Sequence, residues 1–292
     1  MNNVGAGLLL AVGLYLMFTS GIQAATLVVD SRCNIFGAGH GAPNNTPAPS
    51  RGGGGIPPVL FTFPAGPAQV LTFSNVTGTI NVNFGGDASP DGIGPDSGPG
   101  ILFGPWNGIS AISSPRYGCF LGVFCSDRVP TDPAPDYIDF QTLGINFTAL
   151  EPKIGQIFFI GDGKTSGGQP QQFLVPTNAS RLYLGIPDSV GGPPGWYDDN
   201  TGSVTATFEI ATQHPTVSVR VIRVSEVELC WDTATNVWYQ LQYSSTPTTN
   251  QWAPLIVWIP GDGQGFRTND TVLPVQPQRF YRVAVANSPP QP

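Results

Sequence analysis

Glycine and proline interrupt this chain so often that no long segment with helical periodicity is left. The 292 residues include 37 glycines and 30 prolines. In a helix interior, glycine is about 1 kcal/mol and proline about 3 kcal/mol less favourable than alanine. Both residues suit short strands joined by many turns. A hydrophobic content of 40%, with 17 Phe and 6 Trp, excludes a disordered chain. The chain is therefore expected to be globular and all-β.

The strand-like segments fall into two groups. In "SVTATFEI" (203–210), small or apolar residues alternate with polar ones, which is typical of an antiparallel strand with one buried face. Around Gln213 the character changes, and the later strand-like segments contain tryptophan. We therefore predict two β-sandwich domains, at 58–212 and 213–287.

The remaining segments lie at the two ends of the chain. Residues 25–57 are expected to form an N-terminal strand and a flexible Gly/Pro-rich loop or linker, and residues 288–292 a tail. The apolar run Leu8 to Phe18 is short for a bilayer span, and small residues follow it near Ala24. This pattern predicts a signal peptide at 1–24 and a secreted protein, extracellular or periplasmic, with no membrane span after cleavage. An uncleaved anchor stays open as an alternative, since no Lys or Arg precedes the apolar run.

The charge balance argues against nucleic acid as a partner. The formal net charge is −7, and Lys153 and Lys164 are the two lysines. No basic stripe is present to contact phosphates. The cysteines match no zinc-binding spacing and favour buried thiols or one structural disulfide. They are Cys33, Cys119, Cys125 and Cys230.

No motif indicates an enzyme. "FFIGDGKTSGG" ends like a phosphate-binding loop, but Phe158 stands where that motif needs glycine, and no helix can follow. No serine lies in a nucleophile elbow, and neither His40 nor His214 has the context of a general base. A carboxylate pair of the glycosidase type stays open among the aspartates. We expect a protein without catalytic activity.

One loop concentrates negative charge. Between "RLYLGI" and the strand "SVTATFEI" lie Asp188, Asp198, Asp199 and Asn200, with no Lys or Arg among them. If the flanking strands form a hairpin, Asp188, Asp199 and Asn200 meet at one sheet edge. Calcium takes six to eight oxygen ligands from carboxylates, amides and carbonyls. A bound cation would also offset the repulsion between the acids. The alternative is a solvated loop whose Asp and Asn residues serve turns.

The segment "GWYDDNTGS" (195–203), with Asp188 upstream, resembles the calcium loop of the soluble bacterial galactophilic lectins of the PA-I type. The resemblance covers about 58–212 and implies a small jelly-roll sandwich. It implies calcium ligands from the Asp188 carboxylate, the Trp196 carbonyl and the side chains of Asp199 and Asn200. A further carbonyl would come from "GTINVNFGG" (78–86). Sugar hydroxyls would complete the shell, with Trp196, Asp199 and Asn200 as carbohydrate-binding residues.

The loop departs from the lectin pattern at two positions. Asp199 stands where the family has asparagine, and Asp198 where it has glycine, so this loop is more acidic. Trp196 is expected either to offer an apolar face to a sugar ring or to pack on the hairpin. The family's His-x-x-Gln sugar contact has no counterpart in "ISAISSPRYGCF", so galactose specificity does not carry over.

The C-terminal region resembles a fibronectin type III or comparable small sandwich. Trp231 after "VELC", the segment "YQLQYS" and the closing "FYRVAVAN" carry the likeness. The leading functional expectation is a secreted, calcium-dependent carbohydrate-binding protein whose partner is a carbohydrate or cell-surface glycan. The first alternative is an extracellular structural or adhesive protein that binds no sugar. A secreted hydrolase comes third.

Overall fold

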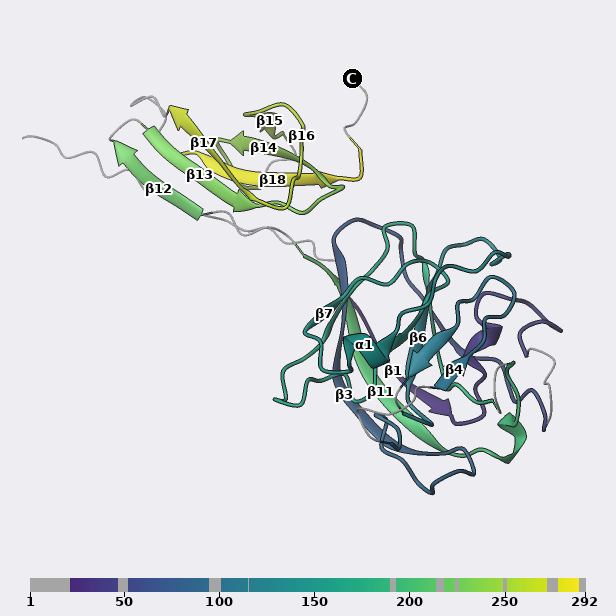
Figure 1. Cartoon of the computed structure of the whole chain (residues 1–292). Coiled ribbons are helices and arrows are strands. Elements are labelled where there is room, and N and C mark those ends of the chain that lie inside the picture. Colours follow the sequence, from purple (N-terminus) through teal and green to yellow (C-terminus); the bar gives the residue numbers. More distant parts are fainter. Residues whose placement is uncertain are drawn as a thin grey trace, which may run out of the picture. The chain divides into compact units, whose positions relative to one another are not determined.

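The structure is a computed structural model that describes residues 22–46, 52–94, 101–114, 116–189, 193–213, 218–223, 226–248, 251–271 and 278–288. Strands dominate these residues, and a single α-helix of four residues occurs among them. The expected all-β class is confirmed. The chain divides after Thr212 into two compact units, and the second begins at Gln213 (Figure 1).

The first unit contains eleven strands, one short α-helix and two 3-10 helices among the described residues. They are β1 (Gln23–Asp30), η1 (Ile35–Gly37), β2 (Val59–Thr62), β3 (Gln69–Asn81), β4 (Ile101–Phe103), β5 (Ile112–Ser114), β6 (Leu121–Cys125), α1 (Phe140–Leu143), β7 (Ala149–Leu150), β8 (Ile157–Phe159), β9 (Gln172–Leu174), β10 (Arg181–Gly185), η2 (Tyr197–Asp199) and β11 (Thr201–Thr212).

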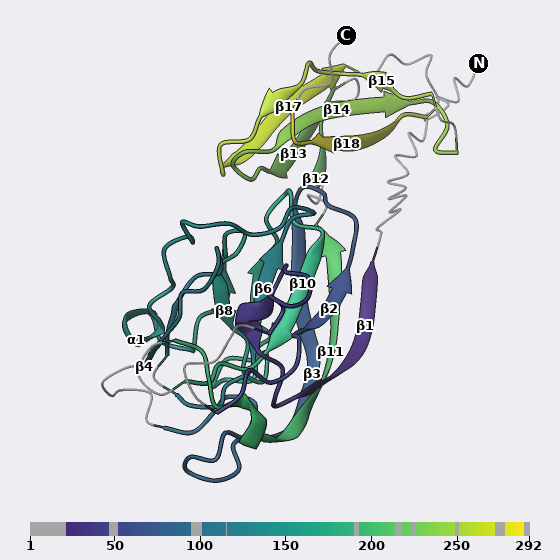
Figure 2. The same ribbon diagram turned by 90° about the vertical axis from the view of Figure 1, so that its right-hand side faces the viewer.

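These strands form a sandwich of two main sheets. One has the order β1-β11-β3-β9-β7, and β4 and β5 form a separate pair. The other has the order β2-β10-β6-β8, and its four strands are labelled in Figure 2. The long central strands β3 and β11 are antiparallel, with Thr201 opposite Asn81 at the end where β11 begins. In β11, Val204, Ala206, Phe208 and Ile210 are buried, as the alternation predicts.

Aromatic side chains join the two sheets. Phe61 of β2 meets Phe208 of β11 edge-on, with 5.1 Å between ring centroids. Phe158 of β8 also lies across from Phe173 of β9, with tilted rings whose centroids are 5.1 Å apart. Within one sheet, Phe73 of β3 packs on Phe208, with 5.4 Å between ring centroids. Burying large aromatic side chains between two sheets is the main stabilising contribution expected for such a sandwich.

The expected hairpin between 181–185 and 201–212 does not form, because β10 and β11 belong to different sheets. The connection that carries the acidic residues instead crosses from one sheet to the other. Alternation reports which face of a strand is buried but not which strand pairs with it, so the sequence could not distinguish a hairpin from a crossing.

The second unit is also built from two sheets. Its strands are β12 (Ser218–Arg223), β13 (Glu226–Asp232), β14 (Trp238–Ser244), β15 (Ala253–Pro254), β16 (Ile259–Pro260), β17 (Gly265–Thr271) and β18 (Phe280–Ala286). One sheet has the order β12-β13-β17, and in the other β14 pairs with β15, β16 and β18. A separate core lies within the unit, formed around Leu229, Trp231, Tyr239, Leu241 and Tyr281.

The expected signal peptide can be compared with the structure only near β1, where the described residues begin. The apolar run Leu8 to Phe18 and most of the expected signal peptide lie outside the described residues. Cleavage near Ala24 would fall two residues into β1, and Ala25 to Asp30 would keep their pairing with β11. Across the residues that the structure describes, no helix has the length and apolarity needed to cross a membrane.

The four cysteines, all of them in the described part of the chain, form no disulfide. Cys33, Cys119 and Cys125 are buried, and Cys230 is partly exposed. Burial raises the pKa of Cys33 to about 11 and that of Cys125 to about 12. Both thiols therefore stay protonated and unreactive at neutral pH.

Candidate metal centre

Tyr197 ties the two ends of the acidic loop together. Its side chain is fully buried, and its hydroxyl donates to the Ile186 carbonyl at 3.0 Å. The same hydroxyl oxygen accepts the backbone N–H of Asp188, also at 3.0 Å. A second closure is the bond from the Gly195 N–H to the Asp188 carbonyl at 3.1 Å. Asp188 is thus brought next to residues 195–200 without a hairpin.

Asp188 and Asn200 form the buried part of the site. Their exposed fractions are 8% and 3%. The Asn200 side chain lies close enough to the Asp188 carboxyl group to lower its pKa. Within the described residues, however, Asp188 Oδ2 and Asn200 Oδ1 are buried without a hydrogen-bond partner. An unsatisfied buried polar group costs about 1–3 kcal/mol, and more when it is charged. A proton or a bound cation would satisfy two such oxygens in neighbouring side chains.

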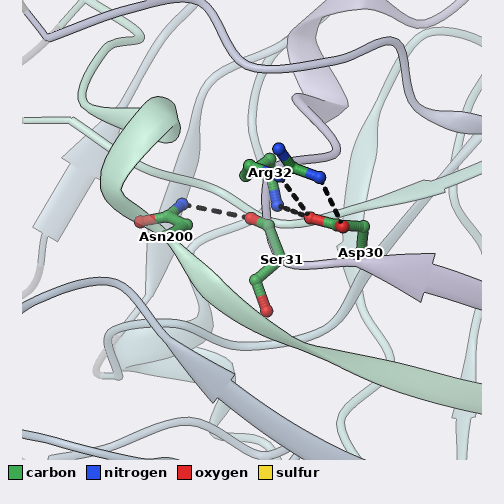
Figure 3. Close-up of polar contacts among 4 residues, drawn as sticks. All are labelled: Asp30, Ser31, Arg32 and Asn200. Atoms are coloured by element: carbon green, nitrogen blue, oxygen red, sulfur yellow. Dashed lines mark hydrogen bonds and ion pairs between the residues drawn. The ribbon is translucent and has the colours of Figure 1, made fainter.

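Asn200 is held by the turn that follows β1. Its Nδ2 donates to the Ser31 carbonyl at 3.1 Å, and the Ser31 N–H donates to the Gly202 carbonyl at 3.1 Å. Figure 3 shows the Asn200 amide nitrogen directed at that carbonyl, with the Ser31 hydroxyl pointing away from Asn200. Beside them, Arg32 and Asp30 form their own ion pair at 2.9 Å. The orientation of the Asn200 oxygen is therefore fixed from outside the loop.

Burial dominates the electrostatics of Asp188. The pKa of Asp188 is raised to about 7, chiefly by desolvation and to a smaller extent by the neighbouring charge of Asp199, while the Asn200 side chain and the Ser189 backbone N–H act to lower it. Such a shift means that the ion-free site disfavours the charged carboxylate. A bound cation would reverse that preference.

Asp199 lies at the exposed rim of the same site. Its Oδ2 accepts a hydrogen bond from Asn83 Nδ2 at 3.1 Å. Asn83 follows β3 in a left-handed conformation, with φ of 53°, and its N–H donates to Asn81 Oδ1 at 2.8 Å. The end of β3 thus lies against the loop, within the segment 78–86 from which a further carbonyl ligand is expected.

The third aspartate of the loop is used differently. Asp198 is exposed, and its Oδ1 accepts the Gly55 N–H at 3.1 Å. Trp196, just before η2, has a left-handed backbone with φ of 67° and ψ of 17°. Its side chain is half-buried, and its Nε1 is buried with no partner among the described residues. The expected ligand role of its carbonyl and its expected sugar contact stay predictions.

The chemistry of this donor set fits a hard cation. In the part of the chain that the structure describes, no group of three or more His, Cys, Asp or Glu side chains could hold a metal. The loop instead offers the carboxylates of Asp188 and Asp199 and the amide of Asn200, and backbone carbonyl ligands stay a prediction. Oxygen-only coordination that mixes these groups is typical of calcium and not of zinc. The buried oxygens of Asp188 and Asn200 that lack a hydrogen-bond partner are of the type that calcium binds.

Three residues that support the site were missed by sequence reasoning. Tyr197 closes the loop, Ser31 positions Asn200, and Asn83 contacts Asp199. Tyr197 lies in the quoted motif, but nothing in the sequence indicates that its hydroxyl bridges Asp188 and Ile186. Ser31 is distant in sequence and had no signal of its own. Asn83 lies in the segment 78–86 that was expected to supply a carbonyl, but its side-chain contact with Asp199 was not expected.

No family model matches the chain, and the searches of curated proteins and of solved structures find no match either. The likeness to calcium-dependent lectins therefore rests on the loop residues and their flanking strands.

Proposed function

We propose that this chain is a secreted, calcium-dependent carbohydrate-binding protein of the lectin type, with no catalytic step. The observation that carries the proposal is the pair of orphaned oxygens, Asp188 Oδ2 and Asn200 Oδ1, in side chains that are more than nine-tenths buried. A calcium ion would accept both oxygens and would stabilise the charged form of Asp188.

The arrangement around the ion supports a role in binding a ligand. Asp188 and Asn200 lie on the buried side, and Asp199 lies exposed at the rim. An ion held between them has a coordination side open to solvent. Calcium accepts neutral oxygen ligands, so vicinal hydroxyls of a sugar could replace water there. The resemblance of residues 195–203 to the lectin loop supports the same ligand class.

The direct test is retention of the full-length protein on a glycan array in calcium, in chelator, and after calcium is restored. We expect retention with calcium, loss in chelator and recovery on restoration. Thermal unfolding run in parallel should show a higher Tm with calcium, because ligand at 100 times its Kd stabilises the folded state by about 2.7 kcal/mol.

The outcomes separate the proposed function from its main alternative. A calcium-dependent rise in Tm without glycan retention would leave a structural calcium site in an extracellular adhesive or scaffolding protein. If calcium changes neither Tm nor retention, the proposed metal centre is wrong.

A further inference from the structure

A run of four glycines, Gly52 to Gly55, lies directly against the turn that carries the candidate ligands. Gly52, Gly53 and Gly55 have φ values of 68°, 87° and 70°, a region that other L-residues rarely adopt. We refer to residues 52–55 as the glycine strap.

At Gly52, Gly53 and Gly55 the strap leaves no room for a side chain. A Cβ atom added at Gly52 would lie 2.5 Å from Cε3 of Trp196, and one at Gly55 would lie 2.6 Å from Cβ of Tyr197. A Cβ atom at Gly53 would overlap the Asp198 carboxyl group. Both the backbone conformation and the packing therefore require glycine here.

Hydrogen bonds connect the strap to the same turn. The N–H of Gly55 donates to Asp198 Oδ1 at 3.1 Å. In return, the N–H groups of Tyr197 and Asp198 donate to the carbonyls of Gly53 and Gly52, both at 3.4 Å. Asp198 therefore uses a carboxylate oxygen to hold the strap.

The strap is itself fixed to the segment that orients Asn200. Asn34 Nδ2 donates to the Gly54 carbonyl at 3.1 Å, and the Ile56 N–H donates to the Arg32 carbonyl at 2.9 Å. Ser31, the residue before Arg32, holds the Asn200 amide. The expected flexible loop thus makes specific contacts where it is described, and residues 31–56 contact the candidate ligand loop at two points.

We propose that the glycine strap is a positioning element of the metal centre and that Asp198 is its latch, not a calcium ligand. The strap holds the turn 196–198 so that the Trp196 carbonyl and the side chains of Asp199 and Asn200 are in place before the ion arrives. This inference rests on the proposed calcium site. It also gives Asp198 a role where the lectin pattern has glycine.

Preorganisation predicts a defined pattern of calcium affinities. Asp198→Ala removes the carboxylate that accepts the Gly55 N–H, so the strap loses its side-chain attachment to the turn. We expect calcium to bind about tenfold more weakly as a result. Asp198→Asn keeps an oxygen acceptor for the Gly55 N–H, so its Kd should stay within about threefold of wild type. Gly53→Ala should weaken binding at least as much as Asp198→Ala.

The test is a calcium titration of full-length variants by isothermal titration calorimetry, with calcium dissociation rates from chelator mixing. Gly168→Ala is the matched control, because Gly168 has φ of 77° but a Cβ atom there meets nothing within 4 Å. It adds the backbone strain without disturbing the strap. We expect weaker binding and faster dissociation in Gly53→Ala and Asp198→Ala, and near-wild-type binding in Asp198→Asn and Gly168→Ala.

Two results would overturn the inference in distinguishable ways. Wild-type protein that binds no calcium would remove the proposed function and the strap's role with it. Wild-type binding that Gly53→Ala and Asp198→Ala retain in full, with Tm lowered equally in calcium and in chelator, would leave the site intact and reduce the strap to a stabilising contact. If Gly53→Ala does not fold, the comparison of Asp198→Ala with Asp198→Asn decides the question.

Discussion

Burial gives the three loop aspartates different chemistry. Asp188 is almost fully buried and holds one oxygen without a partner in the described residues, whereas Asp198 and Asp199 are exposed. Asp198 contacts the glycine strap, and Asp199 contacts Asn83. A buried carboxylate is disfavoured by desolvation, and only a nearby positive charge or several donors can offset that loss. Asp188 is therefore the residue whose behaviour depends most on a bound ion.

Asp188 should give the ion-free protein a characteristic pH dependence. Its pKa is about 7 in the folded protein and near 3.9 in an unfolded chain. The stabilising effect of its neutral form is fully present below about pH 4 and is lost as pH rises through about 7. In chelator, this group should lower the free energy of unfolding by on the order of 3 kcal/mol across that window. Urea unfolding of wild type and Asp188→Asn between pH 4 and 8 measures this contribution to the free energy of unfolding.

The comparison with Asp188→Asn isolates this residue from the other titrating groups. The variant keeps the side-chain shape but carries no charge, so its stability should fall less steeply as pH rises. Equal slopes in the two proteins would show that Asp188 titrates normally and that the desolvation argument fails.

At the scale of elements, the connection between β10 and β11 determines the site. It crosses between sheets, and Tyr197 closes it by bridging Asp188 and Ile186. The alternating pattern predicted β11 and its buried face correctly, because side-chain period and burial are local properties of a strand. The pairing partners and the bridging hydroxyl depend on the packed sandwich, so the sequence could not show them. The convergence of Asp188 with Asn200 was expected, but by a hairpin that does not exist.

Removing the Tyr197 hydroxyl should loosen this connection. Tyr197→Phe leaves the Asp188 N–H and the Ile186 carbonyl without their hydroxyl partner in the interior, which should destabilise the protein by about 1–3 kcal/mol. Calcium affinity should fall as well, because Asp188 loses its tether. Urea unfolding and calcium titration measure the two effects. Tyr137→Phe, at a side chain that is 46% exposed, is the control. An unchanged calcium Kd in Tyr197→Phe would show that the tether does not position Asp188.

At the scale of the whole molecule, the two units have separate hydrophobic cores. The first centres on aromatic residues such as Phe73, Phe158 and Phe208, and the second on Trp231, Tyr239 and neighbours. The change in sequence character near Gln213 coincides with the position where the second unit begins. The boundary between the units is visible in the sequence because each hydrophobic core needs its own set of strands with apolar residues.

Because the two units have separate cores, we predict that the first unit folds and binds calcium without the second. A fragment of residues 25–212 contains the loop, the end of β3, the glycine strap and Ser31. It should fold and bind calcium with a Kd within about twofold of that of the chain from residue 25 to 292. Calorimetric titration of both proteins gives the comparison. A folded fragment that has lost calcium binding would mean that the C-terminal unit contributes to the site.

The most direct test of the central claim is a calorimetric calcium titration of wild type, Asp188→Asn and Asp127→Asn near pH 7.5. Asp127 is an exposed aspartate of the same unit, so its variant removes one charge without touching the loop. We predict that wild type and Asp127→Asn bind one calcium ion with similar Kd, while Asp188→Asn loses binding by about a hundredfold or more, roughly 2.7 kcal/mol. Calcium binding in Asp188→Asn equal to that of wild type would contradict the account.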